Sequence, residues 1–431
     1  MAAKTAGKTR AGKTDKQDKK MDAKSKTQLA AILAAMGPGL LTAFAGNDAG
    51  GIATYSTTGA TYGFGMLWTV PIMCLLLIVV QETSARMGCA TGKGFASLIR
   101  ERFGVRVSAL AMLSLIISNF TVTLSEFAGI ASGMQLFGVP LQVSVPVSAL
   151  VTWMLAMSGS YHRIEKILLG LSCVFLTYIV SGFMAGPNWG QALHDTIVPQ
   201  FSNDPHYISL LVANIGTTIS PYMIFMVSSS VVEKNLDASD IPGQRADNIS
   251  GAIAAEIVTW FIILTTGTVL HPAGISINSA ADAAKALVPL AGKYASVLFA
   301  VGLVGASFLA ACVLPGITAS AVCEAFGWER GADRTWREAP VYRGIITGIT
   351  ILSAVIILIP NVDLFGIMMV SQVINGVMLP VLLVCMVLIA ADRHIMHRHA
   401  NGKVWNGLTW FTIIAVTFFT IVMFVLQALG Y

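Results

Sequence analysis

The chain has 431 residues, of which 55% are hydrophobic and only 11% are charged, and its mean hydropathy is +0.73. Soluble domains carry about 25% charged residues, so this composition excludes an ordinary soluble protein and indicates a polytopic membrane protein. The formal net charge of +5 needs no nucleic-acid partner, because the basic residues fall in segments that membrane topology explains.

The first 28 residues differ from the rest of the chain. They contain nine Lys or Arg and no aromatic residue, so they cannot bury a core. They also lack the apolar core of a cleavable signal peptide. We predict that residues 1–28 form a disordered, basic cytosolic tail that sets the topology, with a lipid-binding or regulatory role as the alternative.

The remaining chain divides into apolar runs, and a helix needs about 20 such residues to cross a bilayer. We therefore predict an all-α membrane protein with eleven transmembrane helices. The predicted spans are 30–58, 66–88, 107–137, 142–159, 164–186, 206–233, 248–271, 292–327, 341–359, 363–391 and 407–430. The third and eighth runs are long, so we expect those helices to tilt or to extend beyond the lipid.

The basic residues indicate the orientation. If the N-terminus is cytosolic, 25 of the 27 Lys and Arg residues fall in the tail or in cytosolic loops, and only Lys285 and Lys293 fall outside. Cytosolic loops are enriched in Lys and Arg. We therefore predict a multi-pass protein of the plasma membrane with a cytosolic N-terminus and an extracellular C-terminus.

The predicted outer segment at 187–205 is polar, and it carries His194, Asp195 and Asp204, with His206 just beyond. We expect a surface loop here. The alternative is an external site that gathers metal ions.

Two predicted spans contain features that interrupt a helix. In the first, Gly37-Pro38-Gly39 opens the apolar run and Asn47-Asp48-Ala49-Gly50-Gly51 interrupts it, while Pro221 lies in the middle of the sixth. Proline removes a backbone donor, and unpaired backbone groups in lipid are costly, so a broken helix persists only around a cavity or inside protein. A simple proline kink in a packed bundle is the alternative.

The two interrupted spans lie five apart. Many secondary transporters consist of two inverted repeats, with broken helices at matching positions facing a site at the membrane midplane. We therefore predict a first repeat at 29–186, a second inverted repeat at 206–392, and a loop with an additional span at 393–431.

Few acids lie inside the predicted spans, and intramembrane acids usually mark a functional pathway. They are Asp48, Glu82, Glu126 and Glu256. Asp48 lies at the break, where freed backbone carbonyls are also available, and carboxylates with carbonyls bind hard cations. Glu126 either supports this site or only bonds two helices together.

The tenth predicted span contains Gln372 and Asn375, which lie three residues apart and so share one helix face. These amides could bond helices together, or they could line a cavity and supply oxygen ligands.

Five segments of the chain resemble the Nramp family of divalent transition-metal transporters, which have the LeuT-type fold. These segments are "GPGLLTAFAGNDAGGIAT", "QETSARMGCATGK", "LSEFAG", "GTTISPYMIFMVSSSVVEK" and "SQVINGVMLP". They are similar, respectively, to parts of the first, second, third, sixth and tenth helices of that family. The resemblance implies a metal transporter, not an enzyme, with no cofactor other than its transported ion.

The metal site implied by the resemblance differs in composition from the family pattern. Asp48 matches the aspartate that binds the metal, but Gly51 replaces the asparagine ligand and Ser220 replaces the methionine. Thr217 stands at the alanine whose carbonyl binds the metal.

Two further positions concern the family's proton route. Tyr222 stands where the family has a histidine after its proline, and Thr123 stands where the third helix usually carries a second acid. Neither side chain titrates near neutral pH as histidine does. We therefore predict weak or absent proton coupling, with Asn47, Glu126, Tyr222 and Thr123 acting around the site or along the pathway.

Loss of the thioether and of the asparagine leaves an oxygen-only, wider pocket. Oxygen ligands suit Mg²⁺, Ca²⁺ and Mn²⁺, and Mg²⁺ keeps several of its waters when it binds. The predicted function is therefore import of partly hydrated Mg²⁺, and also Mn²⁺, by alternating access. The predicted metal-site residues are Asp48, Gly51, Thr217, Ser220, Gln372 and Asn375.

The alternatives are a proton-coupled Mn²⁺/Fe²⁺ importer of the same fold, a symporter for an organic solute, and a membrane scaffold or sensor that transports nothing. The acid at Asp48 disfavours a carboxylate-bearing solute. As partners we expect the divalent ion and the lipid bilayer, with no nucleic acid, and we expect a monomer.

Overall fold

The computed structural model describes residues 47–158, 173–202 and 204–428. The predicted tail at 1–28, the first part of the first span with Gly37-Pro38-Gly39, and the start of the fifth span lie outside these residues. Within the described ranges the regular elements are all helical, as the composition predicts.

The α-helices are α3 (Ala49–Tyr62), α4 (Thr69–Thr91), α5 (Phe95–Leu136), α6 (Leu141–Ser158), α8 (Thr177–Met184), α9 (Trp189–Ile197), α10 (Pro205–Thr218), α11 (Pro221–Glu233), α12 (Ile241–Val269), α13 (Ala280–Ala284), α14 (Val288–Ala291), α15 (Ala295–Phe326), α16 (Pro340–Ile357), α17 (Leu364–Ala390), α18 (Arg393–Met396) and α19 (Lys403–Ala428). Short 3₁₀ turns occupy η1 (Cys173–Leu176), η2 (Lys285–Leu287), η3 (Gly292–Tyr294) and η4 (His397–His399).

In the described part of the chain, nine segments are long and apolar enough to cross a membrane, and a shorter apolar helical segment covers Val174–Met184. Each lies on one of the predicted spans, although several boundaries shift, and the segments on the third and eighth spans begin 12 residues early, at Phe95 and Ala280. The first predicted span is described only from Asn47 onward, so the count of eleven stays a prediction.

Two predicted loops contain helices. The segment before the third span is helical from Phe95, because Phe95, Leu98 and Ile99 are buried and follow the spacing of a helix face. The helix turns at Gly104, whose φ of 76° favours glycine. The predicted outer loop likewise contains α9, which buries Ala192. In both segments the many polar residues made the apolar face of the helix hard to recognise in the sequence.

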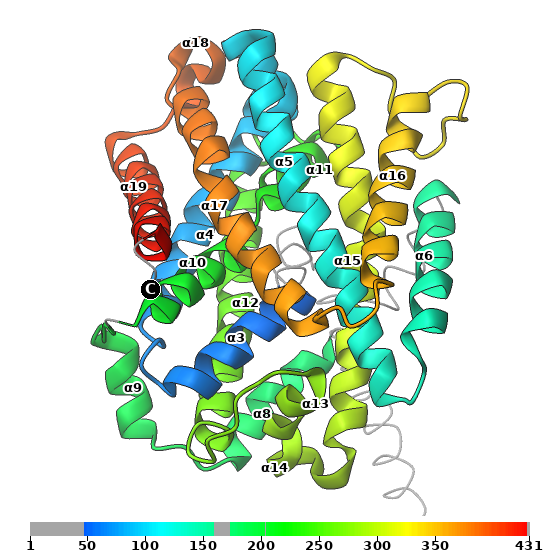
Figure 1. Cartoon of the computed structure of the whole chain (residues 1–431). Coiled ribbons are helices and arrows are strands. Elements are labelled where there is room, and N and C mark those ends of the chain that lie inside the picture. Colours follow the sequence, from blue (N-terminus) through cyan, green and yellow to red (C-terminus); the bar gives the residue numbers. More distant parts are fainter. Residues whose placement is uncertain (1–46, 159–172, 203, 429–431) are drawn as a thin grey trace, which may run out of the picture.

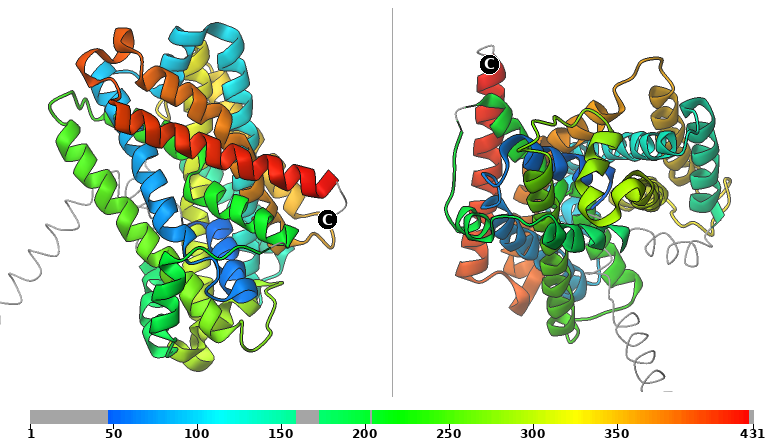
Figure 2. Two further views of the ribbon diagram at one scale, coloured as in Figure 1. Left: turned by 90° about the vertical axis from the view of Figure 1, so that its left-hand side faces the viewer. Right: turned by 90° about the horizontal axis from the view of Figure 1, so that it is seen from below.

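The long helices pack around the start of α3. Helix α5 packs along α15 and α17, and α10 packs against α17. The first residues of α3, drawn in dark blue, lie near the middle of the molecule (Figure 1). Helices α6 and α16 lie on one side of it, and α19 lies on the other side. Helix α19 crosses the outside of the bundle, as the left view of Figure 2 shows.

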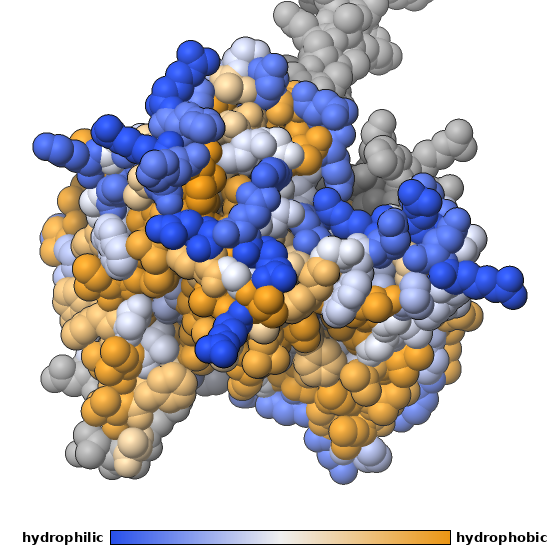
Figure 3. Space-filling view, turned by 90° about the horizontal axis from the view of Figure 1, so that it is seen from above, coloured by the Kyte–Doolittle hydropathy of each residue, from blue (hydrophilic) through white to orange (hydrophobic). Residues whose placement is uncertain are grey.

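The surface divides into a polar end and apolar flanks. Figure 3 looks onto the end that carries α18, where hydrophilic residues gather and hydrophobic residues form the surrounding sides. Large apolar side chains are exposed on the long helices, including Leu110, Val147, Leu352, Val370 and Ile414. Such broad apolar exposure is typical of a surface that meets lipid.

Glu82, one of the predicted intramembrane acids, lies within an ion-pair network at this polar end. Its carboxylate is buried and accepts hydrogen bonds from the Arg86 Nε at 3.1 and 3.2 Å and from the Arg245 Nη2 at 2.6 Å. Arg86 also donates to the backbone oxygen of His399. Glu82 therefore ties α4 to α12, while its neighbour Arg86 ties α4 to the α18–α19 connection.

Asp204 caps α10 at the opposite end. It accepts the Tyr62 hydroxyl at 2.5 Å and the His206 N–H at 3.0 Å, and these bonds hold the pKa of Asp204 below its ordinary value. We expect Asp204→Ala to cost about 1 kcal/mol, the usual cost of losing an N-cap, and to lower the melting temperature in detergent.

The hydrogen bonds to Asp204 also make the stability of the protein depend on pH. Because the folded-state pKa is depressed, the stabilisation by Asp204 is complete above the ordinary Asp pKa of about 3.9 and is lost as the pH falls below it. The melting-temperature difference between the native protein and Asp204→Ala should therefore shrink in acid. An unchanged difference at low pH would contradict this role.

Candidate metal site

Asp48 lies at the start of α3 and caps it. Its backbone is extended, with φ −73° and ψ −177°, and its Oδ1 accepts the Gly51 N–H at 2.8 Å. The side chain is 2% exposed, and Oδ2 has no hydrogen-bond partner among the described residues. A buried carboxylate oxygen is costly when it is unpaired, so Oδ2 is available for a cation. The structure thus gives Gly51 a capping contact, which the sequence did not predict.

Glu126 approaches the same helix end from α5. Its Oε2 accepts the Ala49 N–H at 3.3 Å, while Oε1 is buried without a hydrogen-bond partner among the described residues. The approach is close because α5 carries Gly129 at the contact, where an added Cβ would lie 2.4 Å from the Ala49 Cβ. Two carboxylates therefore lie at one helix N-terminus, whose partial positive charge favours anions.

The chain leaves helical geometry between α10 and α11, at Ile219 and Ser220. Pro221 opens α11, so it has no N–H to donate there. The Ser220 hydroxyl donates to the backbone oxygens of Gly216 and Thr217, at 3.1 and 3.2 Å. The Thr217 hydroxyl is buried and has no hydrogen-bond partner among the described residues.

The two amides of α17 face this interruption. Asn375 Nδ2 donates to the Gly216 oxygen at 3.2 Å, to the Ser220 Oγ at 3.0 Å and to the Gln372 Oε1 at 3.2 Å. The Asn375 Oδ1 accepts from Ser118 of α5. Asn375 is thus occupied in joining three segments, whereas the Gln372 Nε2 lacks a hydrogen-bond partner within the described chain.

Glycines bring these segments within reach of each other. A Cβ added to Gly50 would lie 1.9 Å from the Gln372 Nε2, and one added to Gly216 would lie 2.2 Å from the Gln372 backbone oxygen. The start of α3, the α10–α11 interruption and α17 therefore meet at Gln372. Ser118 and Gly216 were missed in the sequence, and Gly50 was noted only as part of the helix interruption, because their contacts with distant segments leave no pattern in the chain.

The remaining predicted residues lie around this centre. Asn47 immediately precedes Asp48, and both of its amide atoms lack hydrogen-bond partners among the described residues. Tyr222 is buried in the first turn of α11. The Thr123 hydroxyl donates to the backbone oxygen of Asn119, one turn earlier on α5, and so adds no acid to the site.

The chemistry that results is that of oxygen donors. Within residues 47–158, 173–202 and 204–428, oxygens without hydrogen-bond partners are found on Asp48, Glu126, Thr217 and Asn47. In the described residues, no group of three or more His, Cys, Asp and Glu side chains gathers as a metal site. The arrangement offers two carboxylates and several neutral oxygens, a set that suits a hard divalent cation more than a soft one.

An all-helical membrane protein with this central site matches a known class. The family model of natural resistance-associated macrophage protein-like (Nramp) proteins matches residues 39–426. The chain therefore belongs to the Nramp family, whose members are membrane transporters and not enzymes.

Curated relatives match over nearly the whole length. The divalent metal cation transporter MntH of Ralstonia nicotianae is 28% identical over 415 residues, covering 89% of each chain. The protein of the same name from Caldanaerobacter subterraneus is 24% identical over 384 residues, covering 87% of this chain and 88% of the relative.

Solved structures confirm the fold. The Eremococcus coleocola manganese transporter, in complex with an aromatic bis-isothiourea substituted compound, superposes with a TM-score of 0.76 at 21% identity, covering 91% of this chain and 86% of that one. MhsT in complex with L-phenylalanine gives 0.57 at 15% identity, covering 91% and 98%. These neighbours support the LeuT-type fold.

Proposed function

We propose that this protein is an alternating-access transporter of divalent metal cations and that it carries Mn²⁺ through the site at Asp48. The observation that carries this proposal is the buried Asp48 Oδ2, which has no hydrogen-bond partner in the described part of the chain and lies beside a second carboxylate from Glu126. The relatives named divalent metal cation transporters and the manganese transporter of similar fold support it.

Each residue then has a role in binding. Asp48 gives Oδ2 to the ion while Oδ1 keeps the cap on α3, and Thr217 and Asn47 supply neutral oxygens. Asn375 holds Ser220 and the α10–α11 interruption in place, and Gln372 lies against Gly50. We propose that the first span and the α10–α11 pair are the two broken helices of inverted repeats at 29–186 and 206–392.

A second candidate is Mg²⁺, the ion that the sequence favoured. The comparisons support the manganese alternative better, since manganese appears in the name of a structural neighbour. The observation in favour of Mg²⁺ is that Ser220 and Tyr222 stand where the family resemblance places a thioether and an imidazole. Both ions accept oxygen ligands, so this donor set fits either one.

A competition assay in proteoliposomes separates the two ions. We expect Mn²⁺ uptake, followed with an internal metal-quenched dye, to persist when millimolar Mg²⁺ is added outside. Strong inhibition by Mg²⁺ would favour the magnesium candidate, and uptake of neither ion would contradict the proposed function.

Proton coupling is the other point on which the Mg²⁺ candidate and the manganese alternative differ. The sequence predicts weak coupling, because Tyr222 and Thr123 replace titratable groups, but the comparisons do not support that prediction. Movement of a divalent ion down a membrane potential of 100 mV releases about 4.6 kcal/mol of free energy, which is sufficient for accumulation of the ion without protons. A pH-sensitive dye inside the same liposomes tests this, since acidification that accompanies Mn²⁺ entry would establish coupling.

The setting of the transporter also remains a proposal. We propose a monomer in the plasma membrane, with a cytosolic N-terminus and an extracellular C-terminus. The Lys and Arg bias of the loops supports this orientation.

A further inference from the structure

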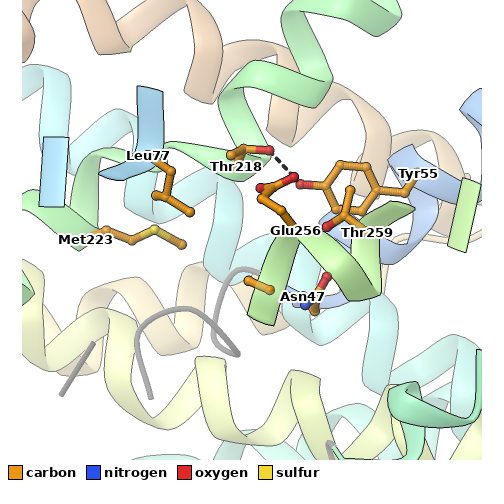
Figure 4. Close-up of a pocket in the computed structure, with 8 residues that line it drawn as sticks. Asn47, Tyr55, Leu77, Thr218, Met223, Glu256 and Thr259 are labelled. Carbon is orange, nitrogen blue, oxygen red and sulfur yellow. Dashed lines mark hydrogen bonds between the residues drawn. The ribbon is translucent and has the colours of Figure 1, made fainter. Parts of the chain in front are cut away.

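A pocket beside the start of α3 contains a carboxylate that the proposed transport site does not use. Its polar lining comes from Asn47, Tyr55, Thr218, Glu256 and Thr259. Figure 4 shows these side chains converging from the start of α3, the end of α10 and the middle of α12, with the hydrogen bond between Tyr55 and Thr218 dashed.

The acid in this pocket is buried and incompletely paired. Glu256 is 5% exposed, and its Oε2 has no hydrogen-bond partner among the described residues. Asn47 is 3% exposed, and both of its amide atoms also lack partners there. A buried carboxylate without a partner is costly, so it either binds a cation or carries a proton.

The neighbouring hydroxyls can accept a cation as well. The Tyr55 hydroxyl and the Thr218 Oγ1 lie 2.7 Å apart, so one of them donates a hydrogen bond to the other. Each hydroxyl oxygen has two lone pairs, and this single bond uses only one of them. Thr259 is buried and adds a third hydroxyl to the lining. Of the described residues that line this pocket, none is Lys, Arg or His, so none of them neutralises Glu256.

Size and charge together select the ligand. The cavity has room for about one water molecule, so it can hold one water, or one ion that takes most of its ligands from the lining. One carboxylate balances one positive charge, whereas a divalent ion here would leave a net charge in a medium of low dielectric constant. We propose that the pocket beside Glu256 binds a single monovalent alkali cation.

This cation site would act on the transport site through the backbone. Asn47 lines the pocket and Asp48 follows it directly, while α3 packs against α12. An ion held between Asn47 and Glu256 therefore fixes the start of α3, on which the Asp48 carboxylate depends. The pocket shares Asn47 with the proposed transport site, but its carboxylate and its hydroxyls belong to it alone, so alkali binding at Glu256 can be tested without the proposed function.

The test is thermal melting of the purified full-length protein in detergent, without divalent ions, in NaCl, KCl or choline chloride at equal ionic strength. We expect a higher melting temperature in the sodium or potassium salt, with saturation at rising concentration. Comparison of the two salts identifies the preferred alkali ion. Glu256→Gln should remove the difference, whereas Glu256→Asp should keep it with a higher half-saturating concentration.

A second variant covers the case in which Glu256→Gln does not fold. Thr259→Val keeps the side-chain shape and removes one oxygen ligand, so we expect its half-saturating concentration to rise about tenfold. Equal melting in all three salts, or a salt response that survives Glu256→Gln, would overturn the proposal. A response to pH alone that Glu256→Gln removes would assign the pocket to a proton instead.

Discussion

Asp48→Asn should abolish Mn²⁺ uptake in proteoliposomes while leaving the protein as stable as the native chain. Asparagine caps helices about as well as aspartate, so the Gly51 contact and α3 should persist. Only the charge on the unpartnered oxygen is lost. Removing one partner of a buried charge pair costs about 2–5 kcal/mol, which weakens ion binding by about 30-fold or more.

Two other variants frame this result. Asp48→Ala removes both the charge and the cap, so it should lose uptake and also melt at a lower temperature. Glu329→Gln removes the same charge from an exposed position on the α15–α16 connection and should transport normally. Native-like uptake by Asp48→Asn would refute the assignment of Asp48 as the ligand.

Gly216→Ala should be the most damaging small substitution in the helix core. The added Cβ would lie 2.2 Å from the Gln372 backbone oxygen and 2.4 Å from the Gly376 backbone nitrogen. Backbone atoms cannot rotate away, so α10 must move off α17. Overpacking of this kind costs about 1–3 kcal/mol, and the shift would separate Asn375 from Ser220. We expect a lower melting temperature together with loss of uptake.

Gly348→Ala is the matched control for that substitution. Gly348 lies in α16, and an added Cβ would meet no other atom within 4 Å. Alanine is the better helix former by about 0.5–1 kcal/mol, so this variant should be as stable as the native protein or slightly more stable. If the two variants melt and transport alike, the close contact at Gly216 does not hold the site together.

The sequence was sufficient to single out residues that the structure places near one another around the start of α3. Asp48, Gln372 and Asn375 stand out in apolar runs because polar groups are costly in lipid, and Pro221 stands out because it interrupts a helix. The structure brings all of them to one place, and the family match explains why they occur together.

The sequence could not show how those groups divide their bonds. The Asp48 Oδ1 accepts the Gly51 N–H, whereas Oδ2 has no hydrogen-bond partner among the described residues. This division depends on local backbone angles. That Ser118 holds Asn375 depends on two helices meeting across more than 250 residues. Neither contact leaves a periodic pattern in the chain. The close packing at Gly50 and Gly216 leaves no pattern either, because it depends on the helix that packs against each glycine and not on the glycine itself.

The intramembrane acids illustrate the same limit. The sequence singles out Glu126 as a possible supporting acid of the site, but it assigns no role to Glu82 or Glu256 beyond that of an acid in an apolar run. The structure separates them into an acid paired with two arginines, an acid at the start of α3, and an acid in a pocket of its own. Only tertiary contacts decide among these roles.

Anomalous scattering at the manganese absorption edge, from crystals grown with Mn²⁺, tests the central claim most directly. The account predicts one strong peak within coordination distance of the Asp48 Oδ2, on the side of Glu126 and Thr217. A bound Mn²⁺ elsewhere in the protein, with no peak at Asp48, would contradict it.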